Sequence, residues 1–391
     1  MRTAEFDIIV YGATGFTGRL IAEYLHERGV TRWAMAGRSA AKLAQVRDLI
    51  GAPAATPLIE ANADEPASLR AMCARTKTLI STVGPYQLYG SDLVAAAVET
   101  GASYVDLCGE PLWMRQMIDA HEAAAKASGA RIVFSCGFDS IPFDLGVWKL
   151  QQIVIDRFGA PAPRIKCRVR TLKGGASGGT VASMKATMAA VGKSPKLLGL
   201  LTNPFALTPG FDGPHQPTGL IPEYDRAEKG WAVPFVMAPI NTKNVHRSNF
   251  LLGDAGYGAD FIYDEMMLTT IGEAGKAIAE AAARINPFGE GKMPKPGEGP
   301  SKQERENGNY EILFTAEMPG RAPVKLVVKG DRDPGYGSTS KMIAEAALTL
   351  NETASGGGVF TAGGLMAGAL LVRLEANAGL SFVEDLSAKS E

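Results

Sequence analysis

Three glycines near the start of the chain have the spacing of a dinucleotide-binding turn. They follow a run of strand-forming residues and precede a stretch with helical periodicity. In such a turn the first glycine permits the tight bend, the second lets the backbone approach a pyrophosphate, and the third lets helix and strand pack closely. The helix then offers unpaired N–H groups to the phosphates. We expect the cofactor to contact Gly12, Thr14, Gly15, Phe16, Thr17 and Gly18.

The end of the second predicted strand indicates which dinucleotide is bound. Arg38 and Ser39 stand there, and no acidic residue accompanies them. A site for NAD would use an acid to accept hydrogen bonds from the ribose hydroxyls, whereas an arginine pairs with the 2′-phosphate of NADP. The sequence therefore predicts an NADP site. The alternative is a solvated arginine at a strand end, with Ser39 serving only as a helix N-cap.

Two later strand ends carry further candidate residues. Asp64 follows the third predicted strand, where it could meet the adenine edge or cap a helix. Val83, Gly84, Pro85 and Tyr86 end the fourth, on the edge where open α/β sheets bind ligands. We expect the first three to line the cofactor and the Tyr86 phenol to approach the nicotinamide. Alternatively, this segment is simply a turn with an aromatic residue on its rim.

A thiol and a carboxylate follow the sixth predicted strand, near the junction between two domains. Cys136 and Asp139 stand where a nicotinamide ring and a substrate would meet, although a hinge needs the same turn residues. Tyr86 is the first candidate for a catalytic acid, and Cys136 and Asp139 rank after it. Asp106 and Glu110 end the fifth strand, where we expect them to hold a loop rather than act on a substrate.

The patterns around these residues predict the fold. Strands alternate with helices up to about residue 145, which is typical of an α/β protein with a doubly wound, Rossmann-type parallel sheet. Farther along, a half-exposed strand over 164–172, a helix over 178–191 and a hairpin over 310–329 indicate an α+β domain with an antiparallel sheet. The expected domains are an NADP-binding domain (1–145), a substrate or dimerisation domain (146–335) and a C-terminal helical segment returning toward the first domain (336–391).

Composition narrows the functional class. The 391 residues carry a net charge of −1, which gives no electrostatic reason to expect nucleic acid as a partner. Four dispersed cysteines and four dispersed histidines predict no metal site and reduced thiols in the cytoplasm. Residues 353–372 are uncharged, but their first half has loop composition. We therefore expect a core helix from about 362 to 376, with peripheral membrane contact as the alternative.

At these motifs the chain resembles the saccharopine dehydrogenase-like oxidoreductases, and most closely the trans-acting enoyl reductases that serve polyketide synthases. Two positions depart from the family pattern: His246 replaces an expected basic residue, and Ala362 replaces a frequent proline. The resemblance rests on Gly12–Gly18, Ala36–Arg38, Thr82–Tyr86, Tyr104–Asp106, Gly109–Glu110, Cys136–Pro142, Trp231–Ala238, Arg247–Asn249, Gly335–Thr339 and Gly357–Thr361.

This resemblance implies a function. It implies an NADPH-dependent reduction of an α,β-unsaturated acyl thioester, small or carrier-bound, in lipid or polyketide metabolism, by a homo-oligomer. An imine or amino-acid reductase is the weaker alternative, because no lysine–histidine pair of the saccharopine-forming type is visible. A non-catalytic NADP-binding scaffold is the third hypothesis.

Overall fold

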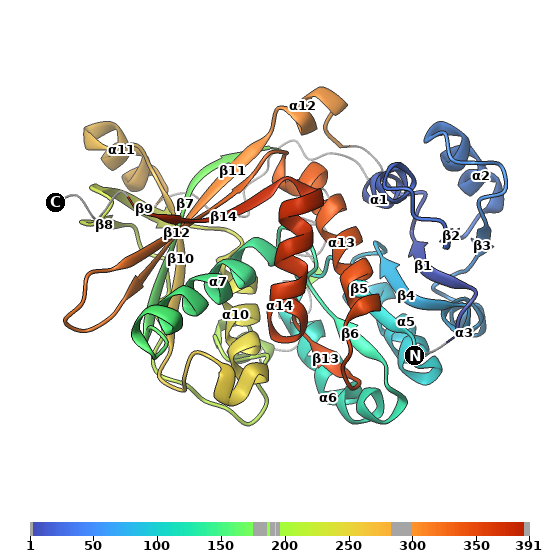
Figure 1. Ribbon diagram of the computed structural model, residues 1–391, viewed down its shortest axis with the longest axis horizontal. Coiled ribbons are helices and arrows are strands. Elements are labelled where there is room, and N and C mark those ends of the chain that lie inside the picture. Colours follow the sequence, from blue (N-terminus) through green and yellow to red (C-terminus); the bar gives the residue numbers. More distant parts are fainter. Residues whose placement is uncertain (1–2, 175–185, 188–191, 193–195, 283–298, 387–391) are drawn as a thin grey trace.

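The computed structural model shows two lobes, each built on one β-sheet (Figure 1). The structure describes residues 3–174, 186–187, 192, 196–282 and 299–386. Helices α13 (Thr339–Glu352) and α14 (Ala362–Arg373) lie between the lobes. The helix expected over 178–191 lies outside the described residues, except for 186 and 187, which are helical.

Seven parallel strands form the first sheet. Their order is β13-β6-β5-β4-β1-β2-β3, which is the Rossmann order with β13 added beside β6. The predicted doubly wound parallel sheet is therefore confirmed. The bounds are β1 Phe6–Tyr11, β2 Trp33–Gly37, β3 Leu58–Glu60, β4 Thr76–Ser81, β5 Ser103–Asp106, β6 Arg131–Val133 and β13 Gly358–Phe360.

Helices cover both faces of this sheet, because alternate strand residues point to opposite sides. Ile8 and Val10 pack on one face with residues of α1 and α13, whereas Ile9 and Tyr11 pack on the other with residues of α3, α5 and α6. The helices of this lobe are α1 Phe16–Glu27, α2 Ala40–Leu49, α3 Pro66–Ala74, α4 Tyr86–Tyr89, α5 Ser91–Thr100 and α6 Pro111–Ser128.

The second sheet also has seven strands, in the order β14-β12-β11-β7-β10-β9-β8. The predicted hairpin is present as β11 and β12. The sheet is mixed rather than purely antiparallel, because β7 and β10 pair in parallel. The bounds are β7 Arg164–Lys173, β8 Glu223–Asp225, β9 Gly230–Pro234, β10 Ile262–Leu268, β11 Asn309–Glu317, β12 Val324–Gly330 and β14 Leu380–Asp385.

Helices α7 and α10 connect the two lobes. Helix α7 spans the expected boundary at residue 145 and packs on β11 and β12, while α10 packs on α7, α14 and β10. The remaining helical elements are α7 Ile141–Phe158, α9 Lys196–Thr202, α10 Ala238–Leu252, η1 Gly253–Ala255, α11 Gly272–Ala282, α12 Lys302–Glu306, η2 Pro334–Ser338 and η3 Leu374–Ala378.

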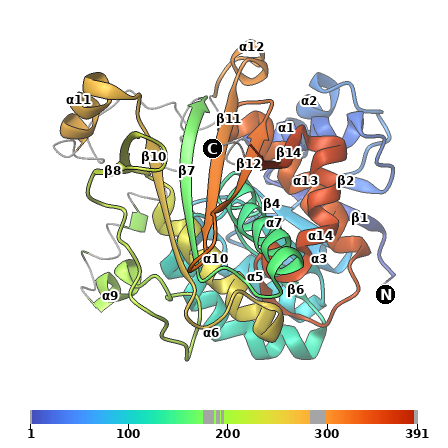
Figure 2. The same ribbon diagram turned by 60° about the vertical axis from the view of Figure 1, so that its left-hand side comes forward.

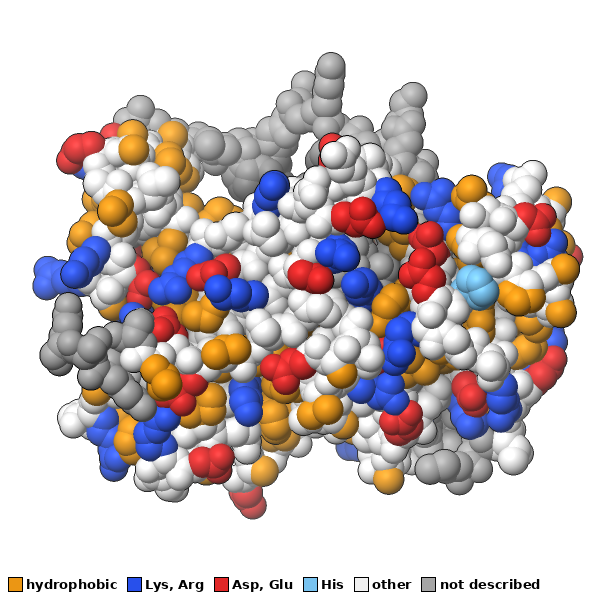
Figure 3. Space-filling model, turned by 45° about the horizontal axis from the view of Figure 1, so that its top comes forward, with side chains coloured by type: hydrophobic (Ala, Val, Ile, Leu, Met, Phe, Trp, Pro, Cys, Tyr) orange, Lys and Arg blue, Asp and Glu red, His pale blue; other side chains and the backbone are white. Residues whose placement is uncertain are grey.

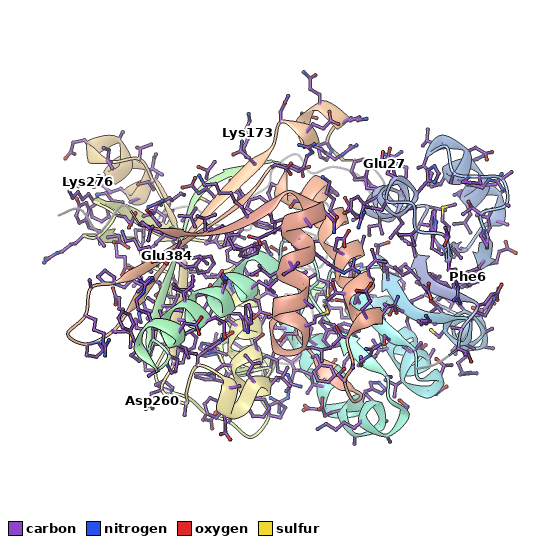
Figure 4. All side chains as sticks on the ribbon, viewed as in Figure 1. Phe6, Glu27, Lys173, Asp260, Lys276 and Glu384 are labelled. Carbon is purple, nitrogen blue, oxygen red and sulfur yellow. The ribbon has the colours of Figure 1, made fainter. Side chains whose placement is uncertain are left out.

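The C-terminal segment contributes to both sheets. Besides α13 and α14 it supplies β13, which pairs with β6, and β14, which pairs with β12. The strand β14 was not expected from the sequence. Its Glu384, labelled in Figure 4, forms an ion pair with Arg157 of α7 at 2.7 Å. The segment thus joins the lobe that carries Phe6 to the lobe that carries Glu384.

The uncharged stretch near the C-terminus ends in a buried helix, as the sequence predicted. Helix α14 contacts α7, α10 and α13 and continues into η3 up to Ala378. Among the residues that the structure describes, no helix is long and apolar enough to cross a membrane.

Candidate active site

The glycine turn has the geometry that the sequence predicted. Gly12 has a φ of +89°, which L-residues with a side chain rarely adopt, and an added Cβ would lie 2.5 Å from the Thr82 hydroxyl oxygen. Gly15 takes the N-cap position of α1 without a side-chain cap. A Cβ on Gly18 would lie 2.2 Å from the carbonyl oxygen of Gly12, so only glycine permits this approach of helix and strand.

The first turn of α1 is therefore open to an anion. No acidic side chain stands in that turn, and no side chain caps its N–H groups. The predicted contact residues Thr14 and Gly15 are exposed, and Phe16 and Thr17 are half-buried. These features fit the pyrophosphate of a dinucleotide, because helix N-termini favour negative charge.

Arg38 lies at the end of β2, beside the glycine turn. Its side chain is exposed and, within the described part of the chain, forms no ion pair. Burial raises the pKa of the neighbouring Tyr11 to about 12, and the charge of Arg38 opposes that rise. Ser39 caps α2, since its Oγ accepts from the N–H of Lys42 at 3.4 Å. A free guanidinium beside the turn fits a 2′-phosphate.

The remaining expected cofactor residues lie on the same sheet edge. Asp64 is exposed and close enough to raise the pKa of Tyr11, but Glu65 takes the N-cap position of α3, so Asp64 is not the cap. Val83 and Pro85 are half-buried and Gly84 is exposed, directly after β4. Together with the glycine turn and Arg38, these positions can hold NADP.

Tyr86, the first candidate acid, has a different environment from the one expected. Its hydroxyl donates to the carbonyl oxygen of Ser81 at 3.1 Å and accepts from the N–H of Leu107 at 3.1 Å. The ring is 5% exposed, and burial raises the pKa of the phenol well above its ordinary value. Both hydrogen-bonding roles of the hydroxyl are filled by backbone groups, which favours a structural role.

Cys136 is also placed in a structural environment. Its thiol is fully buried in the core of the first lobe, and burial raises its pKa well above the usual range. A thiol of this kind is chemically inert. Two carboxylates hold loops here. Asp106, the last residue of β5, accepts from the N–H groups of Cys108 and Ser135. Glu110, at the N-cap of α6, accepts from those of Tyr86 and Gln87.

Asp139 differs from the other two acid candidates. It is half-buried in the turn between β6 and α7, and burial raises the pKa of its carboxyl from 3.8 to about 7. Its Oδ1 is inaccessible and has no hydrogen-bond partner among the described residues. A buried carboxyl of this kind is protonated in a large fraction of molecules at neutral pH, so it can donate a proton.

Polar side chains of the second lobe surround this turn. From α10, Asn244 donates to the Oγ of Ser140 at 2.8 Å, and Asn241 donates to Glu265 of β10 at 2.9 Å. Tyr263 donates to the other oxygen of Glu265 at 2.8 Å. Burial raises the pKa of Glu265 well above its ordinary value, and the carboxylate of Asp139 adds to that rise. The domain junction therefore holds two carboxyl groups that resist ionisation.

The opposite side of α10 carries cationic groups. Burial lowers the pKa of Lys243 to about 8, and its Nζ donates to the carbonyl oxygen of Pro239 at 2.9 Å. Burial and the charge of Lys243 lower the pKa of His246 to about 3, so this imidazole is neutral. Arg247 reaches the first lobe, donating to the carbonyl of Val359 at 2.8 Å. The His246 ring lies 4.6 Å from that of Phe205.

Several buried polar atoms in this region have no partner among the described residues. They are Asp139 Oδ1, Asn241 Oδ1, Asn244 Oδ1, His246 Nε2 and Arg247 Nε. Most buried polar groups in proteins are hydrogen-bonded, so the unpartnered atoms of Asp139, Asn241 and Asn244, on the side of α10 that faces this turn, favour a ligand site there. Part of the signal is visible in the sequence, because 238–252 is rich in amides and cations, but the burial of these groups is not.

The fold and the site define the class of protein. Residues 8–133 match the family model of the saccharopine dehydrogenase NADP binding domain. A saccharopine dehydrogenase (L-Glu forming) from Saccharomyces cerevisiae has a similar fold, with a TM-score of 0.53 and 11% identity over 97% of this chain and 99% of that one. The first lobe therefore carries an NADP binding domain of the saccharopine dehydrogenase type, and the whole chain shares the fold of that enzyme.

Sequence relatives narrow this class. A trans-acting enoyl reductase of Mycobacterium leprae (strain TN) is 37% identical, covering 95% of this chain and 96% of the relative. A Mycobacterium tuberculosis (strain ATCC 25618 / H37Rv) protein that carries the same name provisionally is 39% identical, covering 96% and 97%. The chain belongs to the trans-acting enoyl reductase family.

Proposed function

We propose that the protein reduces the carbon–carbon double bond of an α,β-unsaturated acyl thioester with NADPH. Relatives named trans-acting enoyl reductases support this reaction, since their alignments with this chain cover nearly its whole length. The glycine turn and the free guanidinium of Arg38 support NADPH as the reductant. The single structural observation that carries the proposal is the carboxyl of Asp139 at the domain junction, whose Oδ1 is buried without a partner among the described residues and whose pKa burial raises to about 7.

The reaction needs a hydride for the β-carbon and a proton for the α-carbon. The glycine turn and Arg38 would hold NADPH, which would supply the hydride and be oxidised to NADP⁺. Asp139 supplies the proton from its neutral carboxyl and is reprotonated from solvent, so the product is the saturated thioester. A pKa of about 7 suits this step, because an acid near the working pH is both largely protonated and able to give up its proton.

The second lobe prepares Asp139 for this role. Ser140, the next residue, is held by Asn244 of α10, which fixes the turn. Burial raises the pKa of the Asp139 carboxyl, and burial also raises that of Glu265, its acidic neighbour on β10. The half-buried position of Asp139 leaves part of its side chain accessible while limiting contact with water.

Other parts of the assignment follow from the relatives and the chemistry. The word "trans-acting" in their names supports a substrate delivered on a separate carrier protein. We propose lipid or polyketide metabolism as the setting and a homo-oligomer as the working form. The four cysteines are all free thiols, which supports a reducing, cytoplasmic location.

An enoyl-thioester panel tests the proposal. The same acyl chains are presented on N-acetylcysteamine, coenzyme A and an acyl carrier protein, with NADPH consumption followed by absorbance and the product by mass spectrometry. With NADPH deuterated at the transferred position, one deuterium should appear at the β-carbon. Tight NADPH binding without turnover on any carrier would favour a scaffold. Turnover that requires an amine together with a keto acid would favour an imine reductase.

A further inference from the structure

The second lobe reaches the glycine turn of the first through the ring of Phe16. Tyr336 of η2 meets this ring edge-on, with centroids 4.8 Å apart. The backbone of Gly299 also lies against it, since an added Cβ would be 2.5 Å from a ring carbon. Figure 2 shows α12, which follows Gly299, above α1 at this junction.

Two arginines flank the same ring, one from each lobe. The guanidinium carbon of Arg19, on α1, lies 5.3 Å from the Phe16 centroid, and that of Arg305, on α12, lies 5.5 Å from it. Both side chains are half-buried, and neither forms an ion pair in the described part of the chain. Arg19 is the fourth residue of α1, so its contact with Phe16 keeps a cation close to the N-terminus of that helix.

Hydrogen bonds to backbone groups position Arg305 beside η2. Its backbone carbonyl accepts from the N–H of Asp333 at 3.0 Å, and its Nη1 donates to the carbonyl of Pro300 at 2.8 Å. Asp333 in turn accepts from the N–H groups of Tyr336 and Gly337, which fixes η2 against Phe16. No hydrogen bond to a described residue engages the remaining N–H groups of the Arg305 guanidinium. They stay available beside the N-terminus of α1.

Charges of one sign alternate with the other over the surface seen in Figure 3, where most cations have acidic neighbours. Arg19 and Arg305 thus place two guanidiniums beside an anion-accepting turn, and neither forms an ion pair with a described residue. The charge of Arg305 acts on Asp333, since it opposes the rise in pKa that burial causes there. Arginine matches phosphate oxygens with paired N–H donors.

We propose that Arg19 and Arg305 together bind the pyrophosphate of NADP, so that the cofactor is held by both lobes. Arg38 then recognises the 2′-phosphate, which distinguishes NADPH from NADH, whereas Arg305 recognises a group that both dinucleotides carry. The cofactor would thus bridge α1 of the first lobe and α12 of the second. The inference concerns NADP binding and stands apart from the enoyl reaction.

Equilibrium binding separates these roles. Dissociation constants are measured for NADPH, NADH and adenosine 2′-monophosphate, the last of which lacks the pyrophosphate. The proteins are the parent, Arg305→Gln, Arg19→Gln and Arg38→Gln, with Lys302→Gln as the control, because Lys302 is exposed on the same short helix. Thermal unfolding without cofactor shows that each variant is folded.

Arg305→Gln should weaken NADPH and NADH by the same factor, about tenfold to a hundredfold, and leave adenosine 2′-monophosphate unchanged. Arg38→Gln should weaken NADPH and adenosine 2′-monophosphate but not NADH, and Lys302→Gln should change none. Unaltered NADPH binding in Arg305→Gln would overturn the proposal. An equal loss for adenosine 2′-monophosphate would overturn it too, since that result means a general distortion of the site.

Discussion

Replacing Asp139 by asparagine should abolish its proton donation and, at the same time, stabilise the protein at neutral pH. The parent enzyme should lose activity as the pH rises through about 7, because Asp139 ionises there. The asparagine variant cannot donate the proton, so kcat should fall by about 10²–10⁴-fold and lose this pH dependence.

The stability effect has the opposite sign. The folded-state pKa of Asp139 is raised from 3.8 to about 7, so between these values the unfolded chain binds fewer protons than the folded one. Stability contributed by this residue therefore falls as the pH rises through that window. The full difference is about 4 kcal/mol, from about 3 pKa units at about 1.4 kcal/mol each, and is an upper bound because the group is partly exposed.

Urea unfolding of the parent and the variant at roughly pH 5 and pH 8 measures this difference. Asp144→Asn is the matched control: burial also raises the pKa of Asp144 to about 7, but its carboxylate accepts from the N–H of Gly363 and takes no part in the proposed reaction. It should share the stability gain without the loss of kcat. An Asp139→Asn enzyme that keeps the parent rate and its decline above pH 7 refutes the proton-donor assignment. A stability difference that does not grow with pH refutes the electrostatic reasoning.

Two further outcomes are expected. Arg38→Ala should raise the Kd for NADPH about tenfold to a hundredfold without changing that for NADH, so that the two converge in a fluorescence titration; equal affinities in the parent would remove the NADP preference. Tyr86→Phe should leave the pH–rate profile unchanged. It should lower the free energy of unfolding by about 1–3 kcal/mol in urea, because the N–H of Leu107 loses its buried acceptor. A shifted pH–rate profile would instead indicate that Tyr86 is a catalytic acid.

The parts of the site that the sequence predicted well are local. Gly12, Gly18 and Ser39 act within a few residues of their own position, so residue type and spacing sufficed. The ranking of the candidate catalytic acids did not anticipate their burial. The Tyr86 hydroxyl is hydrogen-bonded to backbone groups at the ends of two strands, and the spacing of residues in the sequence does not show such contacts. Asp139 was named, but the reason for its raised pKa lies in packing.

The second lobe was harder to predict because its contacts are distant in the chain. Asn244 donates a hydrogen bond to Ser140, more than a hundred residues earlier in the chain. Strand β7 pairs in parallel with β10, and not with β8, the next strand along the chain. Strand β14 pairs with β12 although the last segment reads as helical. Helix α10 shows its polar residues in the sequence, but only the approach of two lobes turns them into a buried cluster.

The double attachment of the C-terminal segment limits how this protein can be cut or recombined. A fragment ending after β6 would leave that strand as an open edge and expose the sheet face that α13 covers, which invites aggregation. In a chimera with the second lobe of a relative, β13 would have to come from one parent and β14 from the other. Both strands lie within one short stretch of chain. Exchange of one lobe alone would therefore have to cut the chain between β13 and β14, where α13 and α14 already pack between the lobes.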